Sequence, residues 1–211
     1  MRRTRQQALA TRQSILDAAV QVFLEHGFQH TAIQDVAERA GVTRGAVYWH
    51  FRNQLDVLEA LLDTTRLPWQ VLQPLPRSLL GSTPVAPMRQ ALVRMATTPL
   101  TWLEGSVPAQ QMLRILGQMN EPDSATRLGV RLSARLDADR SAGLQCLRMA
   151  LAQAAASGAL RQGTDPGAAA LGLFVLVDGL MHQWLRQPEA FDLTAVGTQA
   201  VQSHLAGLLP N

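Results

Sequence analysis

The residues best suited to contact another molecule lie in one short segment, Thr43–Phe51 (TRGAVYWHF). An arginine such as Arg44 can donate two hydrogen bonds to one guanine, and tyrosine and histidine side chains can reach phosphate oxygens. Gly45 lacks a side chain, so the backbone beside Arg44 can come close to base edges. These residue types indicate contact with double-stranded DNA, with Arg44 at the bases and Tyr48 and His50 at the phosphates.

The aromatic residues of this segment could instead belong to a hydrophobic core. We interpret Phe51 as a core residue and favour DNA contact for Tyr48 and His50. For Trp49 both alternatives stay open, because an indole suits a core and a polar interface equally well.

Two helices joined by a tight turn would position these side chains. In Ile33–Val47 (IQDVAERAGVTRGAV), Ala37 is small enough for two helices to cross, and Gly41 can adopt the positive φ that the turn requires. Thr43 is suited to cap a following helix that runs to about Phe51. This spacing predicts a helix-turn-helix.

The distribution of charge supports a contact with DNA. The 211 residues include 19 arginines, no lysine and 16 acidic residues, for a formal net charge of +3. Residues 1–52 hold seven arginines against four acidic residues, and the remainder holds twelve of each. The whole positive excess therefore lies in the segment that carries the motif, where it could meet phosphates.

Apolar spacing and the positions of glycine and proline predict an all-α chain of about nine helices without strands. We expect an N-terminal three-helix helix-turn-helix DNA-binding domain over residues 1–53, and a helical effector-binding and dimerisation domain over residues 54–211. The helices are expected near Thr11–His26, Ile33–Ala40, Thr43–Phe51, from Asn53, Met88–Leu103, Ala109–Met119, Ser124–Ser157, Ala168–Arg186 and Leu193–Leu209.

The segment Thr11–Leu62 resembles the DNA-binding head of the TetR family, particularly its AcrR-like multidrug-efflux repressors. The resemblance is carried by TRQSILDAAVQVFLEHGF, TAIQDVAERAGVTRGAVYWHF and LDVLEALLD; FVLVDGLMHQWL at Phe174–Leu185 is more weakly similar to the eighth helix of that branch. It implies a third helix in the major groove and DNA contacts at Gln34, Arg44, Gly45, Tyr48 and His50. The predicted DNA-binding residues are Thr31, Gln34, Thr43, Arg44, Gly45, Tyr48, Trp49 and His50.

One position departs from that family's pattern. Relatives commonly open the fourth helix with a lysine that binds phosphate, whereas this chain has Gln54. Either Arg52 replaces the missing charge or the affinity for DNA is lower.

The body offers no arrangement of nucleophile and base, no phosphate-binding loop and no metal-ligand spacing. We therefore expect no enzyme activity, no cofactor and no metal. Asp178 and His182 share one helix face, either as a mutually satisfied polar pair or as a polar anchor in a ligand pocket. An enzymatic Asp–His dyad would lack a nucleophile.

Six of the seven methionines lie in the body, where they either fill the core or line an adaptable pocket. The resemblance adds Trp69, Trp102 and Gln118, since the family's cavity lies among helices four to eight. The predicted ligand-binding residues are Trp69, Met88, Met95, Trp102, Met112, Gln118, Met119, Phe174, Asp178 and His182.

Location and assembly follow from composition. The single cysteine, Cys146, cannot form an internal disulfide and is either a small buried residue or a redox switch. The N-terminus lacks the apolar core of a signal peptide, and the run Ala168–Leu180 is interrupted and too short to span a bilayer. We expect a cytoplasmic protein without a membrane partner, forming a homodimer through its unusually apolar last two helices.

These observations predict a repressor of a multidrug efflux or detoxification operon. Small apolar or cationic ligands would release it from a palindromic operator. The alternative is a DNA-binding organiser or regulator of the same fold without a small-molecule effector.

Overall fold

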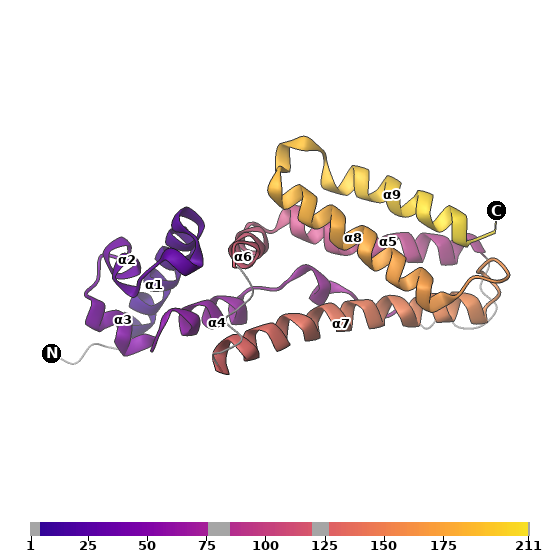
Figure 1. The fold of residues 1–211 in the computed structure, drawn as a ribbon. Helices are drawn as coiled ribbons and strands as arrows, with labels where there is room; N and C mark the ends of the chain where they lie inside the picture. The colour runs from indigo at the N-terminus through magenta and orange to yellow at the C-terminus, as the bar shows by residue number, and fades with distance from the viewer. Residues whose placement is uncertain (1–4, 76–84, 120–126, 211) are drawn as a thin grey trace. The chain divides into compact units, whose positions relative to one another are not determined.

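The computed structural model describes residues 5–75, 85–119 and 127–210, with the side chains of 127–129 excepted. Over these residues the chain is helical and contains no strand, which confirms the all-α prediction (Figure 1). The α-helices are α1 (Arg5–His26), α2 (Ile33–Arg39), α3 (Arg44–His50), α4 (Gln54–Thr64), α5 (Val85–Gly105), α6 (Val107–Gly117), α7 (Arg127–Ala156), α8 (Pro166–Arg186) and α9 (Leu193–Leu208). Short 3-10 helices are η1 (Phe28–His30), η2 (Pro68–Val71) and η4 (Pro188–Ala190).

Most helix boundaries agree with the sequence to within a few residues, and two differ for identifiable reasons. α1 begins at Arg5 rather than near Thr11, because the intervening residues are good helix formers. α5 begins at Val85 and includes Pro87, which was expected to precede the helix; proline is tolerated in a first turn, where its missing N–H has no partner to lose. The expected start of α7 near Ser124 lies outside the described residues.

The chain divides into two compact units. One comprises Met1–Arg66 and Pro108–Arg135, and the other comprises Leu67–Val107 and Leu136–Asn211. α4 therefore groups with the helix-turn-helix. Such a division does not test which segment folds or functions alone, so the domain boundary after residue 53 stays a prediction.

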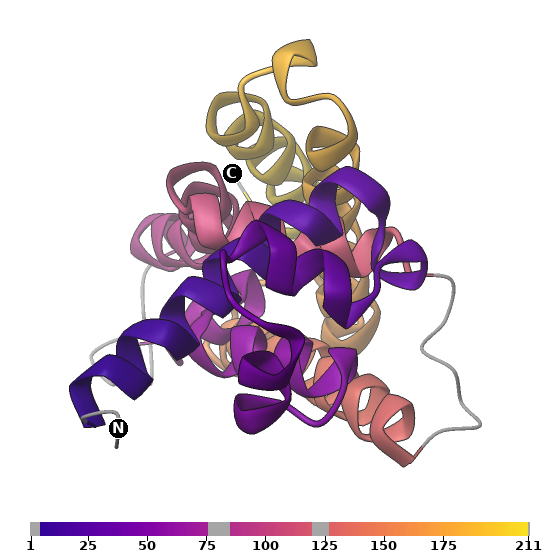
Figure 2. The same cartoon turned by 90° about the vertical axis from the view of Figure 1, so that its left-hand side faces the viewer.

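α1 forms the centre of the first unit and packs against α2, α3 and α4, the helices nearest the viewer in Figure 2. Its expected apolar stripe of Ile15, Ala19, Val22 and Phe23 is buried, as predicted. The ring of Phe23 meets that of Phe28 edge-on, with centroids 5.2 Å apart. This apolar contact holds η1 against α1.

An exposed ion pair joins α1 to α2. The Nη1 atom of Arg39 donates to Oε1 of Glu25 at 2.9 Å, and Nη2 donates to Oε2. These hydrogen bonds and the positive charge of Arg39 lower the pKa of Glu25. The hydrogen bonds to Glu25 and its negative charge raise the pKa of Arg39.

In the second unit α9 packs along α5 and α8. Gly197 of α9 allows a close approach, because a Cβ atom there would collide with Cδ1 of Leu100. Asp192 caps α9 by accepting from the backbone N–H of Ala195 at 2.7 Å, and Glu104 accepts from the N–H of Leu193 at 3.1 Å. The start of α9 is thus fixed to α5 by hydrogen bonds as well as by packing.

α8 has the length and composition of a membrane-crossing helix, so the expectation that this segment is too short for a bilayer was wrong. One face of α8 is buried within the second unit, against α5 and α9. A core helix with such a buried face passes the same test of length and hydropathy.

Candidate DNA-binding surface and ligand site

The turn between α2 and α3 has the geometry that the sequence predicts. Gly41 adopts a φ of +66°, in the left-handed region, and Val42 donates its N–H to the carbonyl of Ala37 at 3.0 Å. Ala37 is buried where the two helices meet. Thr43 caps α3 by accepting from the N–H of Ala46 at 3.2 Å, so its hydroxyl is used within the turn.

α3 has one buried and one exposed face. Val47 is fully buried, whereas Trp49 is 73% exposed and lies outside the core. Phe51 is buried, as predicted, with the guanidinium of Arg12 5.1 Å from its ring centroid. The ring of His50 is half-buried and meets the indole of Trp49 edge-on at 4.6 Å.

Arg44 and Tyr48 form a pair on the exposed face of α3. Nη2 of Arg44 donates to the hydroxyl oxygen of Tyr48 at 3.1 Å, and its Cζ atom lies 5.3 Å from the ring centroid. The residues are four apart, so their side chains lie on one helix face. Gly45 is exposed beside them, with no close contact to a Cβ position. This face can meet the edges of bases and phosphates.

The two predicted contacts before α3 differ in exposure. Gln34 is exposed, and its Nε2 donates to Oε1 of Glu38 at 2.7 Å. Thr31 is only 6% exposed, and its hydroxyl donates to the carbonyl of Gly27 at 2.9 Å. Its burial argues against a DNA contact by the Thr31 side chain, which stabilises the loop before α2.

Gln54, the departure from the family pattern, has an internal partner. Its Nε2 donates to the carbonyl of Phe28 at 2.6 Å and so ties the start of α4 to η1. Arg52 is exposed, and its backbone N–H donates to Asp56 at 3.0 Å. The guanidinium of Arg52 is therefore the nearest cation in the sequence that could serve the phosphate expected at this position.

In the second unit, Asp178 of α8 is contacted by the side chains of Arg140, Trp69 and His182. Arg140 of α7 donates to both carboxylate oxygens at 2.9 Å, and Nε1 of Trp69 donates to Oδ1 at 3.1 Å. The indole of Trp69 stacks on Phe174 with centroids 4.3 Å apart and planes 23° from parallel. Three of the ten predicted ligand residues, Trp69, Phe174 and Asp178, are thus linked by direct contacts, and a fourth, His182, lies beside Asp178.

His182 contributes less to this cluster than the sequence suggested. Its Nδ1 lies 2.8 Å from the backbone oxygen of Asp178 and 3.4 Å from Oδ2, and its side chain is 65% exposed. Arg140 is the main partner of Asp178, and sequence reasoning missed it. It lies 38 positions away, and no local spacing connects the two residues.

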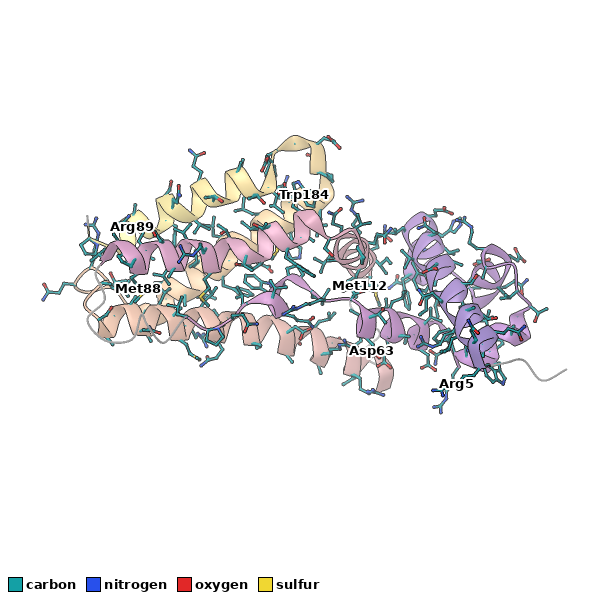
Figure 3. All side chains as sticks on the ribbon, turned by 180° about the vertical axis from the view of Figure 1, so that it is seen from behind. Arg5, Asp63, Met88, Arg89, Met112 and Trp184 are labelled. Carbon is teal, nitrogen blue, oxygen red and sulfur yellow. The ribbon has the colours of Figure 1, made fainter. Side chains whose placement is uncertain are left out.

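The other predicted ligand residues are spread over both units. Met88 and Met95 are buried on α5, where Trp102 is 37% exposed. The remaining three, at and after α6, belong to the first unit, and Figure 3 labels Met88 and Met112 on their helices. Met112 is buried, Met119 is half-buried and Gln118 is exposed. Whether these side chains line one pocket stays a prediction.

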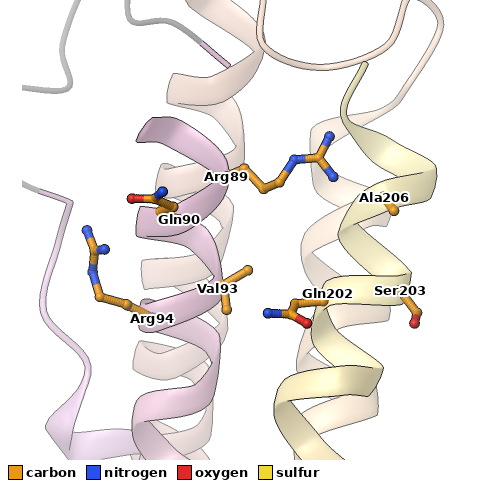
Figure 4. A pocket seen from close by; sticks show the side chains of 7 residues that line it. All are labelled: Arg89, Gln90, Val93, Arg94, Gln202, Ser203 and Ala206. Carbon is orange, nitrogen blue, oxygen red and sulfur yellow. The ribbon is translucent and has the colours of Figure 1, made fainter. Parts of the chain in front are cut away.

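The described residues of the second unit line a smaller and a larger hollow. The smaller, of about 260 Å³, is next to η2 and includes Met95, a predicted ligand residue. The larger is an open groove between α5 and α9, at which no predicted ligand residue lies (Figure 4). Its lining residues are Arg89, Gln90, Val93, Arg94, Gln202, Ser203 and Ala206.

Cys146 of α7 is half-buried, and burial raises the pKa of its thiol. A raised pKa lowers the fraction of reactive thiolate at neutral pH. Of the two alternatives for this residue, a small apolar packing residue is the better supported.

Comparisons with known proteins cover nearly the whole chain. Residues 15–61 match the family described as bacterial regulatory proteins, tetR family, and residues 129–210 match the C-terminal region of BetI-type transcriptional repressors. The chain is 34% identical over 195 residues to the transcriptional regulator TtgR of Pseudomonas putida, covering 92% of this chain and 89% of that protein. It is 30% identical over 216 residues to the repressor BepR of Brucella suis, covering 99% and 96%.

Solved structures are similar over the same length. NalD, the secondary repressor of the MexAB-OprM multidrug efflux pump in Pseudomonas aeruginosa, matches with a TM-score of 0.74 and 28% identity, over 98% of this chain and 100% of NalD. The complex of SmeT with triclosan matches with a TM-score of 0.70 and 32% identity, over 96% and 93%. SmeT is the repressor of the multidrug efflux pump SmeDEF of Stenotrophomonas maltophilia.

Proposed function

Because this chain belongs to the tetR family of bacterial regulatory proteins, we propose that it represses a multidrug efflux or detoxification operon and is released by a small ligand. The observation that carries the proposal is the exposed face of α3, the second helix of a closely packed helix-turn-helix, on which Arg44 and Tyr48 lie. The names of NalD and SmeT as efflux-pump repressors support the choice of operon. The protein would act in the cytoplasm, where its operator lies.

A homodimer would supply two heads for a palindromic operator, with half-sites about 34–36 Å apart. The exposed face of α8 suits such an interface, because Leu171 and Val175 are 46% and 58% exposed and lie four residues apart. Leu205 of α9 is fully buried within the protomer and so belongs to its own core. The proposed interface is therefore centred on the outward residues of α8 and α9.

The Asp178 cluster favours a flat, largely neutral ligand over a cation. Arg140 already compensates the charge of Asp178 through two hydrogen bonds, so little negative charge remains to attract a positive group. Phe174 and Trp69 offer aromatic surface beside it. Such surroundings suit an apolar aromatic molecule with a few polar groups.

A regulator of this fold without an effector is the second candidate. It is favoured by one observation: Trp69 already fills the space against Phe174. A thermal-shift screen of neutral and cationic aromatic drugs separates the two candidates, because a ligand that binds only the folded protein raises its melting temperature.

Operator binding tests the function itself. DNA duplexes selected in vitro with the wild-type protein should contain a palindrome, and an aromatic ligand from the screen should lower their affinity by about 5- to 150-fold. Failure to select any palindrome would refute the repressor. Selection without release by any ligand would favour the second candidate.

The dimer has its own test. Val175→Glu should dissociate the protein in sedimentation and weaken operator binding, because an unpaired carboxylate is not readily buried in an interface. Met149→Glu is the matched control, since Met149 is 51% exposed on a different helix, α7. If the Val175→Glu protein remains dimeric, the dimer interface lies on another surface.

A further inference from the structure

The indole of Trp69 fills a slot between α7 and α8. Trp69 belongs to η2, is only 7% exposed, and stacks on Phe174 of α8. On α7 it lies against Gly143, where an added Cβ atom would be 2.8 Å from Cε3 of the indole and 3.1 Å from its Cβ. Gly143 therefore leaves the space that the ring occupies.

The polar edge of the slot fixes the orientation of the indole. Its Nε1 donates to Oδ1 of Asp178, which also accepts from Arg140. Because Arg140 remains bound to both carboxylate oxygens, a molecule replacing the indole would need no positive charge. It would need a flat aromatic ring system and one N–H or O–H donor.

The segment that leads to Trp69 is bonded along one face of α7. Within the first unit, Glu59 and Asp63 of α4 pair with Arg131 at 3.7 Å and with Arg135 at 2.6 Å. Arg135 also donates to the carbonyl of Leu62 at 3.0 Å.

The same face of α7 continues into the second unit. There Gln70 donates to Asp139 at 2.6 Å, and Trp69 packs on Gly143. The four α7 positions, 131, 135, 139 and 143, are spaced four apart, so each lies on the same side of the helix as the next, along a slowly turning stripe.

Only five positions separate Trp69 from Thr64, the last residue of α4. α4 directly follows the helix-turn-helix in the chain and groups with it in one compact unit. A change in the position of Trp69 therefore acts on the end of α4 through a short connecting segment.

We infer that Trp69 is a built-in occupant of the effector slot: it holds segment 59–70 on α7 in the operator-binding form, and a flat aromatic hydrogen-bond donor releases that segment by taking its place. This inference rests on the proposed function and names the ligand class and the residue displaced. Ligand and Trp69 exclude one another, so the ligand is bound only by the form with the lower operator affinity.

The slot is tested with Trp69→Ala and two small molecules of the same shape. Indole carries the N–H donor, and benzofuran replaces it with an oxygen that cannot donate. Indole should raise the melting temperature of Trp69→Ala by several degrees and benzofuran by less, while the wild type, whose slot is filled, responds weakly to both. Equal shifts in wild type and variant, or none in the variant, would overturn the slot.

The same variant separates coupling from packing. Indole refills the slot of Trp69→Ala without a covalent link to η2, so it should restore thermal stability but leave operator affinity low. If indole restores both, Trp69 is only a packing residue and the inference is wrong. Should Trp69→Ala fail to fold, Gly143→Ala decides the matter.

Gly143→Ala places a methyl group where the indole lies and should lower operator affinity on the order of 10-fold without any ligand, within the usual range of allosteric coupling. Gly105→Ala is the control. Gly105 lies in the same unit, and nothing is within 4 Å of the position that its Cβ atom would take. Unchanged operator affinity of Gly143→Ala would overturn the inference. If the wild type binds no palindrome, the proposed function fails, whereas the indole experiment still tests the slot.

Discussion

Arg44 of the first unit and Arg140 of the second lie over aromatic rings at nearly the same distance. Cζ of Arg44 is 5.3 Å from the ring centroid of Tyr48, and Cζ of Arg140 is 5.4 Å from that of Phe174. They differ in the second partner. Arg140 forms two hydrogen bonds to the carboxylate of Asp178, whereas Arg44 bonds the neutral hydroxyl of Tyr48 and, within the described residues, forms no ion pair.

The second partner decides what each arginine can do. The charge of Arg140 is compensated within the protein, so this arginine holds α7 to α8. In the part of the chain that the structure describes, no acid compensates the charge of Arg44, and its side chain lies on an exposed helix face. The hydrogen bond to Tyr48 only orients its guanidinium. Of these two arginines, Arg140 is therefore a structural contact completed by an acid, and Arg44 is a candidate binding group.

The largest effect is expected for Arg44→Ala. Loss of a bidentate base contact should weaken operator binding by about 1–3 kcal/mol per half-site, and discrimination at one base pair per half-site should relax. Anisotropy titrations against operators with single substitutions measure this. Arg52→Ala is the matched control and should weaken all sequences alike; the same uniform loss in Arg44→Ala would make Arg44 a phosphate contact.

Arg140→Leu should reduce the free energy of unfolding instead, by about 2 kcal/mol, because it leaves a mostly buried carboxylate without its cation. The loss is smaller than for a fully buried pair, since the side chain of Arg140 is 44% exposed. Urea unfolding measures it. The double variant with Asp178→Leu should recover most of the stability. A single variant as stable as the wild type would remove the distinction between the two arginines.

Tyr48→Phe keeps the ring beneath Arg44 but removes the hydroxyl that orients it. Operator affinity should fall by about 2- to 10-fold, the usual range for one hydrogen bond. If Tyr48 positions Arg44, the loss should fall on the base pair that Arg44→Ala affects. A loss spread evenly over all sequences would mean that the hydroxyl contacts a phosphate itself.

The smallest effect is expected for Glu25→Gln, which removes an exposed ion pair from Arg39. The lowered pKa of Glu25 means that its stabilisation is present above the ordinary carboxyl range and is lost as the pH falls through the folded-state value. Urea midpoints of wild type and variant should differ slightly near neutral pH and converge as the pH falls well below the ordinary carboxyl range. A large difference at neutral pH would show that the exposed pair of Arg39 and Glu25 stabilises the fold as much as the pair of Arg140 and Asp178 does.

The helix-turn-helix could be predicted because its determinants are local. Gly41 must adopt a positive φ, Thr43 caps its own helix, and Val47 turns inward by helical periodicity. By residue type both alternatives stay open for Trp49, because an indole suits a core and an interface alike. The same periodicity nevertheless places it, two positions after buried Val47, on the opposite face of α3. Thr31 was expected at the DNA surface, and its burial reflects a loop whose path no local spacing reveals.

The ligand site could be predicted only in part. Asp178 and His182 were recognised by their spacing, but the main partner is Arg140 of another helix, and Trp69 lies 109 positions from the carboxylate it bonds. Apolar residues of the last helix, such as Leu205, were expected at the dimer interface, but an apolar residue is equally typical of a protomer core. Its complete burial assigns it to the core.

The sequence by itself determined the elements of this protein and its candidate DNA-binding face, because turns, caps and i, i+4 pairs such as Arg44–Tyr48 depend on residues within one or two helical turns. Only the tertiary structure decided which charges are free. Whether an arginine meets a carboxylate depends on which helices pack together, and that choice comes from the burial of apolar side chains along the whole chain. Hydrophobic burial has no direction or partner code, so the pairing of Arg140 with Asp178 cannot be derived from the spacing of either residue.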